Sequence, residues 1–550
     1  IAGQTAGNVL QREHEHHGKG CTCGCHPHHE RASERLKNAL LKGSSTGLEE
    51  ALSEALDEYG SALGIIEGPL MAGMEEVGRR FGEGKMFLPQ VVKSAKVMRD
   101  AVKILEPHMG QEGPGSSRPK IVIATVKGDV HDIGKNITGI VLSCNGFEVH
   151  DLGVMVDKET ILEEACKTGA DIIAVSGLIT PSLYQMEELC REMHSRGMNI
   201  PLMIGGATTS ALHTAVKLAP LYGHVFHGAD ASAAAVMAKK YMADRESFER
   251  DMHAEQERLR RLYAANEQMD ESTEERVNDI ISGGVMTPLK DIPSRELSAD
   301  EVMQYFDWRM FYAIWGVKYG SASPEAMELM QLRHDAEDEL AMGNFTVKIS
   351  AKFMNACTDG KDIITDEGRL PMMRQESGGR MSLCDFVSPE SSGNRSVMGA
   401  FTVCVRPKNA AHEEGCCCPA CSNKYEDLVA KAVRMTLAEA ASKWLDAEIL
   451  SNLPEEIKVI KPAAGYSSCP DHTLKRDIMK ILSGKFDLGI RLTESCAMTP
   501  EASICGLIFM HPEARYPEIR RISQEQYEDY AARRSMDITI ARQFLGHLLK

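Results

Sequence analysis

The sequence predicts a multidomain protein with three folded parts: a four-helix bundle, an α/β domain with a doubly wound parallel sheet, and an α+β domain. With 550 residues, the chain is longer than the roughly 100 to 200 residues of an ordinary single domain. Apolar residues recur three and four positions apart between residues 32 and 108, which indicates helices. Between residues 120 and 247, apolar β-rich runs alternate with helix-length segments, as is typical of a parallel sheet with helices on both faces.

The composition favours a soluble protein that binds neither nucleic acid nor a membrane. Hydrophobic residues make up 43% and charged residues 26%, which allows a sizeable core. The net charge of -17 comes without a long basic block that could neutralise phosphates. No stretch approaches the ~20 consecutive apolar residues that a membrane span needs. The 16 cysteines gather mostly in two short clusters, so we expect a reducing, cytoplasmic compartment.

The first 119 residues predict a bundle between two linkers. Residues 1–31 are rich in His, Cys and Gly without apolar periodicity, which predicts a flexible linker. The chain begins with Ile and not Met, so we expect a fragment or a processed product. Residues 32–108 should form four short helices, because Leu36, Leu40 and Leu52 belong to a repeating apolar stripe. Gly and Pro in residues 109–119 then predict a second linker.

The remaining chain divides into a sheet domain, a connector and a C-terminal domain. Within residues 120–247 we expect strands at 121–126, 147–152, 172–176, 201–204 and 225–226. Residues 248–287 are strongly charged and lack a sustained apolar stripe, which predicts an exposed connector. Residues 288–550 mix helical stretches with short strands, so we expect an α+β domain there.

A loop suited to metal binding follows the first predicted strand. In an open α/β sheet, ligands bind at the carboxyl ends of the strands. An imidazole on this loop can reach a ligand above the sheet, and a carboxylate two residues earlier can hold its other ring nitrogen. We therefore predict that His131 is a metal ligand and that Asp129 orients it. The loop reads Gly128-Asp129-Val130-His131-Asp132-Ile133-Gly134.

Two further loops are predicted at the same edge of the sheet. The third strand leads into Ser176-Gly-Leu-Ile-Thr-Pro-Ser182, and the fourth leads into Gly205-Gly-Ala-Thr-Thr-Ser210. Their small and hydroxylated residues would leave a deep slot for a slender group and would offer it hydrogen bonds.

These segments resemble the cobalamin domain of the methionine synthase family. The likeness covers residues 122–136 and 151–156 as well as the two loops. It implies that His131 replaces the nucleotide base as the lower ligand of cobalt, and that Asp129 and Ser182 continue its hydrogen-bond chain. The displaced nucleotide tail is expected beside Ser176, Thr180, Gly205 and Gly206. The other residues expected around cobalamin are Gly128, Val130, Asp132, Ile133, Gly134, Leu178 and Ala207.

The helical region is similar to the cap of the same family, on residues 66–71 and 80–95. The family places apolar side chains over the upper face of the corrin, and the matching residues here are Phe81, Leu88 and Val91. Such side chains would keep water away from a reactive cobalt centre. Their spacing by itself predicts only ordinary positions of a bundle core.

Three C-terminal stretches resemble the reactivation domain of the family, which binds S-adenosylmethionine. They are residues 305–308 with Trp315, residues 459–472, and residues 492–498 with 511–516. Acidic groups suit this cationic ligand, while a basic side chain and backbone donors suit its carboxylate. The residues that the resemblance places around the ligand are Asp307, Glu439, Lys461, Ala463, Gly465, Tyr466 and Tyr516.

The C-terminal region also departs from the family pattern. Lys461 stands where the family commonly has Arg, and Ala464 and Pro517 replace an expected proline and an expected aromatic residue. Because Lys lacks the planar two-pronged contact of Arg, we expect a weaker hold on the carboxylate. A cysteine-rich insertion at residues 415–421 has no counterpart and predicts a surface loop. That insertion, or the group Cys21, Cys23, Cys25, His26, His28 and His29, could chelate a soft divalent metal.

The resemblance implies the cobalamin-carrying and reactivation part of a methyltransferase. The family moves a methyl group from 5-methyltetrahydrofolate through methylcobalamin to homocysteine, which gives methionine. Occasional oxidation of the cobalt is repaired by one electron, from flavodoxin or a methionine synthase reductase, and a methyl group from S-adenosylmethionine. The folate domain and the zinc-containing homocysteine domain are expected outside this chain, in the same polypeptide or in a separate subunit.

Three other functions use similar parts. A corrinoid shuttle protein of a methanol or methylamine methyltransferase system shares the bundle and the D-x-H-x-x-G loop, but it would end near residue 250. A cobalamin-dependent sensor would carry a DNA-binding or signalling domain, against which the acidic charge and the lack of a recognition element argue. An isomerase using adenosylcobalamin would need a barrel that this sequence does not predict.

Overall fold

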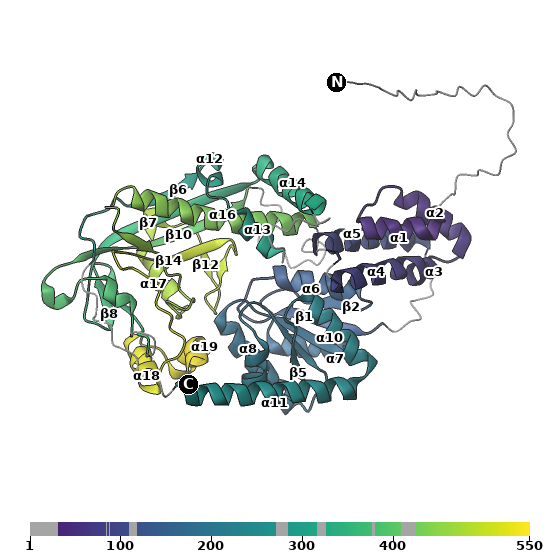
Figure 1. The fold of residues 1–550 in the computed structure, drawn as a ribbon, viewed down its shortest axis with the longest axis horizontal. Coiled ribbons are helices and arrows are strands. Elements are labelled where there is room, and N and C mark those ends of the chain that lie inside the picture. The colour runs from purple at the N-terminus through teal and green to yellow at the C-terminus, as the bar shows by residue number, and fades with distance from the viewer. Residues whose placement is uncertain are drawn as a thin grey trace, which may run out of the picture.

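The computed structural model describes residues 31–83, 85–86, 88–108, 118–270, 284–315, 326–376, 380–408 and 425–549. Both cysteine clusters, and most of the linkers predicted at 1–31 and 109–119, lie outside the described residues. Three folded parts follow one another along the chain (Figure 1). They are an N-terminal bundle, a parallel-sheet domain and an antiparallel-sheet domain, as the sequence predicted.

The N-terminal bundle has four helical segments. The third is unbroken from Ala62 to Gly82, because a π-helical turn joins α3 to α4. The apolar stripe faces inward, with Leu36, Leu40 and Leu52 fully buried. The first helix ends at Gly43, whose φ of 61° is the left-handed conformation that glycine adopts easily. The helices are α1 (Ala32–Lys42), α2 (Leu48–Tyr59), α3 (Ala62–Ile65), η1 (Ile66–Leu70), α4 (Met71–Gly82), α5 (Leu88–Leu105) and η2 (Glu106–His108).

The parallel-sheet domain is doubly wound, with strand order β2-β1-β3-β4-β5. Both faces of β1 are covered, since Ile121 and Ile123 pack in one core and Val122 and Ala124 in another. Its elements are β1 (Lys120–Thr125), α6 (Ile133–Cys144), β2 (Glu148–Asp151), α7 (Lys158–Thr168), β3 (Ile172–Ser176), α8 (Thr180–Ser195), β4 (Leu202–Gly205), α9 (Ala211–His213), η3 (Thr214–Leu218), β5 (Val225–His227) and α10 (Ala231–Ala243).

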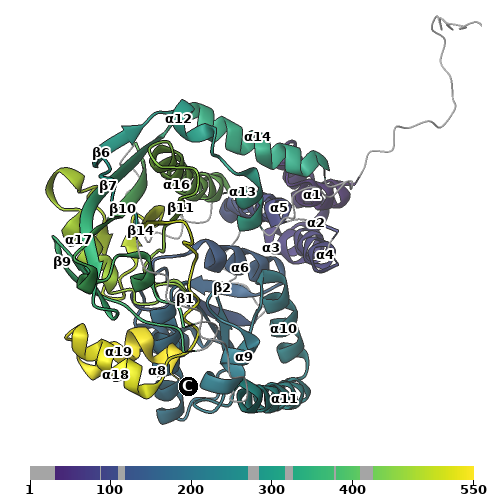
Figure 2. The same cartoon turned by 60° about the vertical axis from the view of Figure 1, so that its left-hand side comes forward.

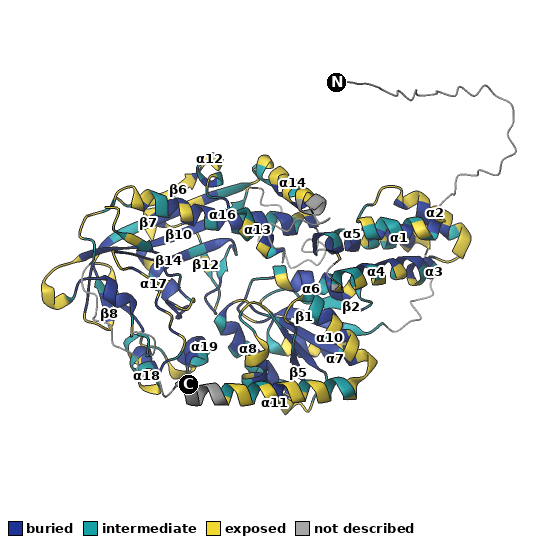
Figure 3. Ribbon diagram, viewed as in Figure 1, coloured by how far each residue is buried: buried dark blue, intermediate teal, exposed yellow. Residues whose placement is uncertain are grey.

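A long helix, α11 (Arg245–Asp270), occupies most of the stretch predicted as a charged connector. Figure 3 shows that much of its surface is exposed. Its first half nevertheless packs on the parallel-sheet domain, because the ring of Phe248 lies 5.2 Å from that of Phe226 and Gln256 donates a hydrogen bond to the carbonyl of Val225.

The antiparallel-sheet domain is built on a sheet of order β11-β14-β10-β7-β8-β9, with β6 also paired to β7. The long helix α16 packs on β7, β10 and β14. The strands are β6 (Ile292–Leu297), β7 (Phe345–Thr358), β8 (Asp362–Thr365), β9 (Gly368–Pro371), β10 (Ser396–Pro407), β11 (Lys458–Ile460), β12 (Arg491–Leu492), β13 (Met498–Thr499) and β14 (Ser503–His511). The helices are α12 (Ala299–Met303), α13 (Trp308–Ile314), α14 (Ala326–Met342), η4 (Leu383–Phe386), η5 (Glu390–Ser392), α16 (Tyr425–Leu450), α17 (Leu474–Ile481), η7 (Gly484–Phe486), α18 (Gln524–Arg533), α19 (Ile538–Leu545) and η8 (Gly546–Leu548).

The two sheet domains lie side by side, and the bundle lies beyond α6 (Figures 1 and 2). Two ion pairs tie the bundle to the antiparallel-sheet domain, Lys93 to Asp335 at 3.1 Å and Lys96 to Glu426 at 2.6 Å. Among the described residues, no helix is long and apolar enough to cross a membrane.

Candidate functional site

The strand order places a topological switch point at the carboxyl ends of β1 and β3. The chain leaves β1 toward β2 on one side and returns to β3 on the other side, so the loops that follow these two strands diverge. Ligands of open α/β sheets bind at such switch points. The loop after β1 holds His131. The loop after β3, residues 177–179, leads into α8, whose first turn holds Thr180 and Ser182.

His131 heads a chain of three hydrogen-bonded side chains. Its Nδ1 lies 2.7 Å from Oδ1 of Asp129, and Ser182 donates its hydroxyl to Oδ2 of Asp129 at 2.7 Å. The backbone N–H of Leu178 also donates to Oδ2, at 2.6 Å. Since Asp129 occupies Nδ1, the nitrogen left for a metal is Nε2, which has no partner among the described residues. The imidazole is held in one orientation with one nitrogen free.

Asp129 is fully buried and ionised. Burial by itself would raise the pKa of its carboxyl group, but the hydrogen bond and charge of His131, with the hydrogen bonds from Ser182 and Leu178, lower that pKa to about 2. A carboxylate that accepts several hydrogen bonds stays charged in this way even without water. It therefore accepts a hydrogen bond from Nδ1–H and leaves Nε2 as the basic nitrogen.

The loops after β3 and β4 pack on each other through glycines. Gly206 has a φ of 115°, and a Cβ atom there would lie 2.0 Å from the carbonyl oxygen of Gly177. Gly177 in turn packs on Ser182, where a Cβ would approach the Ser182 Cβ to 2.4 Å. The hydroxyl of Thr180 is buried without a hydrogen-bond partner among the described residues. The two loops thus pack closely through their backbones, beside a hydroxyl that is unsatisfied among the described residues.

All predicted cobalamin residues of this domain lie at one edge of the sheet, on three loops or on the ends of the strands and helices that these loops join. The loops follow β1, β3 and β4, whose carboxyl ends point the same way because the strands are parallel. The residues at this edge are Gly128, Asp129, Val130, His131, Asp132, Ile133, Gly134, Ser176, Leu178, Thr180, Ser182, Gly205, Gly206 and Ala207.

The antiparallel-sheet domain contacts this edge directly. Thr493 donates its hydroxyl to the carbonyl of Gly128 at 2.7 Å. The neighbouring Ser495 packs so closely on Gly128 that a Cβ there would lie 2.0 Å from its hydroxyl. Lys431 of α16 pairs with Asp132 at 2.6 Å. The sequence did not single out Lys431, Thr493 or Ser495 as site residues, because only the tertiary fold brings them to the loop of His131.

The structure does not bring the three predicted cap residues to His131. The bundle contacts the far end of α6, where Gly78 lies against Asn145. His131 precedes the first turn of that helix, and a helix of 12 residues is about 18 Å long. Leu88 and Val91 are buried, Phe81 is partly buried, and all three belong to the packing of the bundle.

The residues predicted to bind S-adenosylmethionine gather around the second half of α16. Lys461 reaches this helix with its ammonium group, which pairs with Asp446 at 2.9 Å and donates to the Ser442 hydroxyl at 2.7 Å. The backbone N–H of Lys461 donates to the Tyr516 hydroxyl at 3.0 Å. Burial raises the pKa of Glu439, against the opposing charge of Lys461. Sequence reasoning missed Ser442 and Asp446, which no quoted motif contains.

The other members flank this cluster. Asp307 begins α13 and pairs with Lys443 of α16 at 3.2 Å and with Arg309 at 3.0 Å. These two cations keep the pKa of Asp307 well below its ordinary value. Tyr466 is 71% exposed, so its ring is available to a ligand. Gly465 before it has a φ of 100°, and Ala463 pairs with Gly506 of β14.

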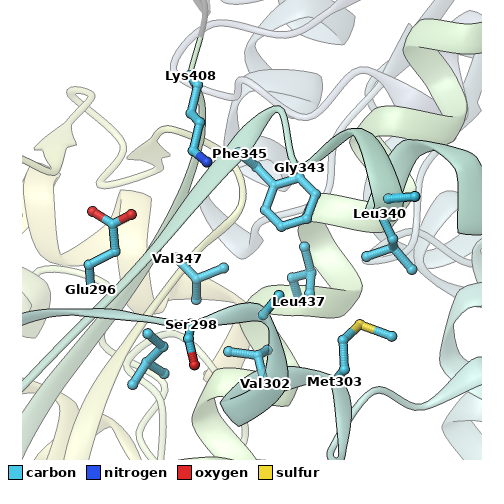
Figure 4. A pocket seen from close by; sticks show the side chains of 13 residues that line it. Glu296, Ser298, Val302, Met303, Leu340, Gly343, Phe345, Val347, Lys408 and Leu437 are labelled. Atoms are coloured by element: carbon cyan, nitrogen blue, oxygen red, sulfur yellow. The ribbon is translucent and has the colours of Figure 1, made fainter.

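Two pockets lie away from both clusters. Figure 4 shows a pocket of about 380 Å³ between α12, α14 and β7, with apolar walls such as Val302 and Phe345. A pocket of about 460 Å³ lies between α5 of the bundle and α6. Neither is lined by a residue predicted for cobalamin or S-adenosylmethionine. Within the part of the chain that the structure describes, no group of three or more His, Cys, Asp or Glu residues could hold a metal ion.

Solved structures with partial similarity to this chain include the following three. The MetH reactivation domain bound to AdoHcy is 29% identical, over 49% of this chain and 93% of that chain, with a TM-score of 0.43. The methanol:cobalamin methyltransferase complex MtaBC from Methanosarcina barkeri is 27% identical, over 39% and 81%, with a TM-score of 0.36. The monomethylamine corrinoid protein of the same organism is 31% identical, over 38% and 96%, with a TM-score of 0.20.

Three family descriptions match the chain in order. The first B12 binding domain matches residues 32–106, and a second B12 binding domain matches residues 119–236. The activation domain of vitamin B12 dependent methionine synthase matches residues 298–535. These matches coincide with the bundle, the parallel-sheet domain and the antiparallel-sheet domain. The chain therefore belongs to the vitamin B12-dependent methionine synthase family, and it contains the B12-binding domains and the activation domain of that family.

Proposed function

We propose that this chain carries cobalamin on the parallel-sheet domain and repairs it with a methyl group from S-adenosylmethionine. It would do so as part of a methionine synthase that moves a methyl group from 5-methyltetrahydrofolate to homocysteine. The observation that carries the proposal is the hydrogen-bond chain from His131 through Asp129 to Ser182, at the edge against which the activation domain lies.

The residues at this edge fit a corrinoid with its nucleotide tail displaced. When bound, cobalamin supplies a cobalt ion that accepts and passes on a methyl group. His131 would offer Nε2 to the cobalt ion, while Asp129 holds the ring by Nδ1. Gly177 and Gly206 place no side chains where their loops meet, and the buried hydroxyl of Thr180 needs a hydrogen-bond partner that the nucleotide tail would provide.

The role of His131 can be tested by its replacement with Gly. We expect His131→Gly to bind methylcobalamin but to lose the protein ligand, and so to change the absorbance spectrum at neutral pH. His150→Gly is the matched control, because His150 lies in the same domain and pairs with Glu148 at 2.9 Å, on the edge strand β2. Identical spectra for His131→Gly and the unmodified chain would contradict the assignment.

The arrangement of domains supports the repair function. The activation domain lies against the loop of His131, whereas the bundle, which resembles the cap, contacts the far end of α6. Repair requires this exchange, because S-adenosylmethionine bound to the activation domain must face the cofactor. Acidic groups around the Lys461 site, Glu439 and Asp446, suit a cationic ligand.

The repair function is tested by a single-turnover assay. The full chain, loaded with cobalamin and supplied with a reductant such as flavodoxin, should form methylated cofactor when S-adenosylmethionine is added. It should not turn over methyltetrahydrofolate and homocysteine at an enzymatic rate without domains that orient them, since positioning contributes roughly 7 to 11 kcal/mol in favourable cases. No methylated cofactor at any S-adenosylmethionine concentration would favour a corrinoid shuttle protein instead.

A further inference from the structure

A buried cluster of three charges crosses the interface between the two sheet domains. Nζ of Lys431, on α16, lies 2.6 Å from Oδ1 of Asp132 and 3.7 Å from a carboxylate oxygen of Glu501. The three side chains are only 20%, 12% and 13% exposed. Asp132 belongs to the parallel-sheet domain and directly follows His131, whereas Lys431 and Glu501 belong to the activation domain.

Asp132 uses its side chain for this contact and not for its own helix. It occupies the N-cap position of α6, where an aspartate ordinarily accepts a hydrogen bond from the first turn. Here its side chain makes no capping hydrogen bond, and its carboxylate faces Lys431 instead. The carboxylate of Asp132 thus serves the contact between the two domains in place of a helix cap.

Glu501 makes Lys431 suited to a reversible contact. Because both residues belong to the activation domain, the cation keeps a carboxylate partner when the domains separate. Burial by itself would lower the pKa of Lys431, but the charges of Glu501 and Asp132 raise it above its ordinary value. Lys431 is thus a charged group that gains a second carboxylate on docking.

The other polar contacts at this edge are weaker or neutral. Lys127 and Glu494 lie 3.5 Å apart and are 49% and 78% exposed, so solvent screens their attraction. Thr493 and Gly128 form a neutral hydrogen bond. A mostly buried ion pair that loses one partner leaves an uncompensated charge, which costs far more than the loss of an exposed pair.

We propose that Lys431 is a positioning residue for the repair reaction: its ion pair with Asp132 holds the activation domain on the loop that carries His131. The proposal rests on the proposed function. Without the ammonium group, the carboxylates of Asp132 and Glu501 face each other across the interface with no cation between them. The activation domain then leaves this edge of the parallel sheet, and the carboxylate of Asp132 no longer has a partner across the interface.

Hydrogen exchange of the full chain tests the contact independently of activity. In Lys431→Met, we expect amides in segments 127–132 and 493–497 to exchange roughly tenfold faster or more, because a buried pair is broken. Lys431→Arg should restore most of the protection, since it keeps the cation. Glu501→Gln should stay protected, because the pair of Lys431 with Asp132 remains. Lys361→Met is the matched control, as Lys361 pairs with Asp529 at 3.1 Å within the activation domain.

The single-turnover assay supplies the second measurement. Lys431→Met should lower the maximal rate of cofactor methylation by about tenfold or more, with little change in the S-adenosylmethionine concentration at half-maximal rate. Unchanged exchange at 127–132 and 493–497 would overturn the proposal. Faster exchange that extends equally into β7, β10 and β14 would also overturn it, because the lysine would then only stabilise its own domain. If the unmodified chain forms no methylated cofactor, the proposed function fails, while the exchange data still decide whether Lys431 holds the interface.

Discussion

The packed glycines of the loops after β3 and β4 give the sharpest test of cofactor binding. In Gly206→Ala, the new Cβ would lie 2.0 Å from the carbonyl oxygen of Gly177 and 2.8 Å from its carbonyl carbon. These are backbone atoms, which cannot rotate away as a side chain could. The opposing loop is also held, since Thr208 donates to the Gly177 carbonyl at 3.2 Å and Gly177 donates to the Gly205 carbonyl at 3.3 Å.

The expected magnitude combines two costs. A residue with a side chain at a φ of 115° is strained by about 1–3 kcal/mol. The overlap with Gly177 adds about 1–3 kcal/mol more, as for overpacking in a core. Relief of this strain requires the two loops to move. That movement displaces residues that are predicted to lie beside the nucleotide tail of the cofactor. We expect the affinity for methylcobalamin to fall by at least about tenfold, equivalent to about 1.4 kcal/mol.

The assay is an equilibrium titration of the chain with methylcobalamin, followed by absorbance, with circular dichroism as the check on folding. Two control variants separate the causes. Gly169→Ala meets a φ of 66° but has nothing within 4 Å of the new atom, and Gly223→Ala also meets open space but at a φ outside the left-handed region. Both should bind the cofactor normally. A folded Gly206→Ala chain with a Kd within about twofold of the unmodified value would refute the reasoning, since tenfold corresponds to 1.4 kcal/mol.

Two further predictions concern the activation domain and the thiols. Lys461→Arg should lower the S-adenosylmethionine concentration needed for half-maximal cofactor methylation. The reason is that a guanidinium can pair with Asp446 and still offer donors to the carboxylate of S-adenosylmethionine. An unchanged or higher concentration would argue against a contact between Lys461 and this ligand. At pH 8, iodoacetamide should modify exposed Cys166 readily but spare Cys144 and Cys190 until the protein unfolds. Burial raises the pKa of both buried thiols to about 12, so only about 10⁻⁴ of each is thiolate at that pH. Mass spectrometry of labelled peptides measures this, and rapid labelling of Cys144 in the folded chain would contradict it.

The sequence by itself determined the local structure and the identity of the cobalamin loop. Each strand of the parallel sheet lies within about one residue of its prediction. For β1, β3 and β4 the reason is that apolar runs buried on both faces have sharp ends. The Asp129-x-His131 spacing was enough to predict a paired imidazole, since two residues on one loop meet without help from the rest of the fold. The extension of that pair to Ser182 came from the family resemblance.

Only the tertiary structure decided which residues of distant segments meet at the site. Lys431 and Asp132 are 299 positions apart, and Thr493 lies 365 positions from Gly128, so no local pattern could pair them. Likewise, the partners of Lys461 on α16 depend on how that helix packs over the antiparallel sheet. The position of the bundle depends on which domain lies against the edge of the parallel sheet near His131. Local periodicity reports which face of a helix or strand is buried, whereas contacts between domains depend on how whole surfaces fit, which a single sequence does not reveal.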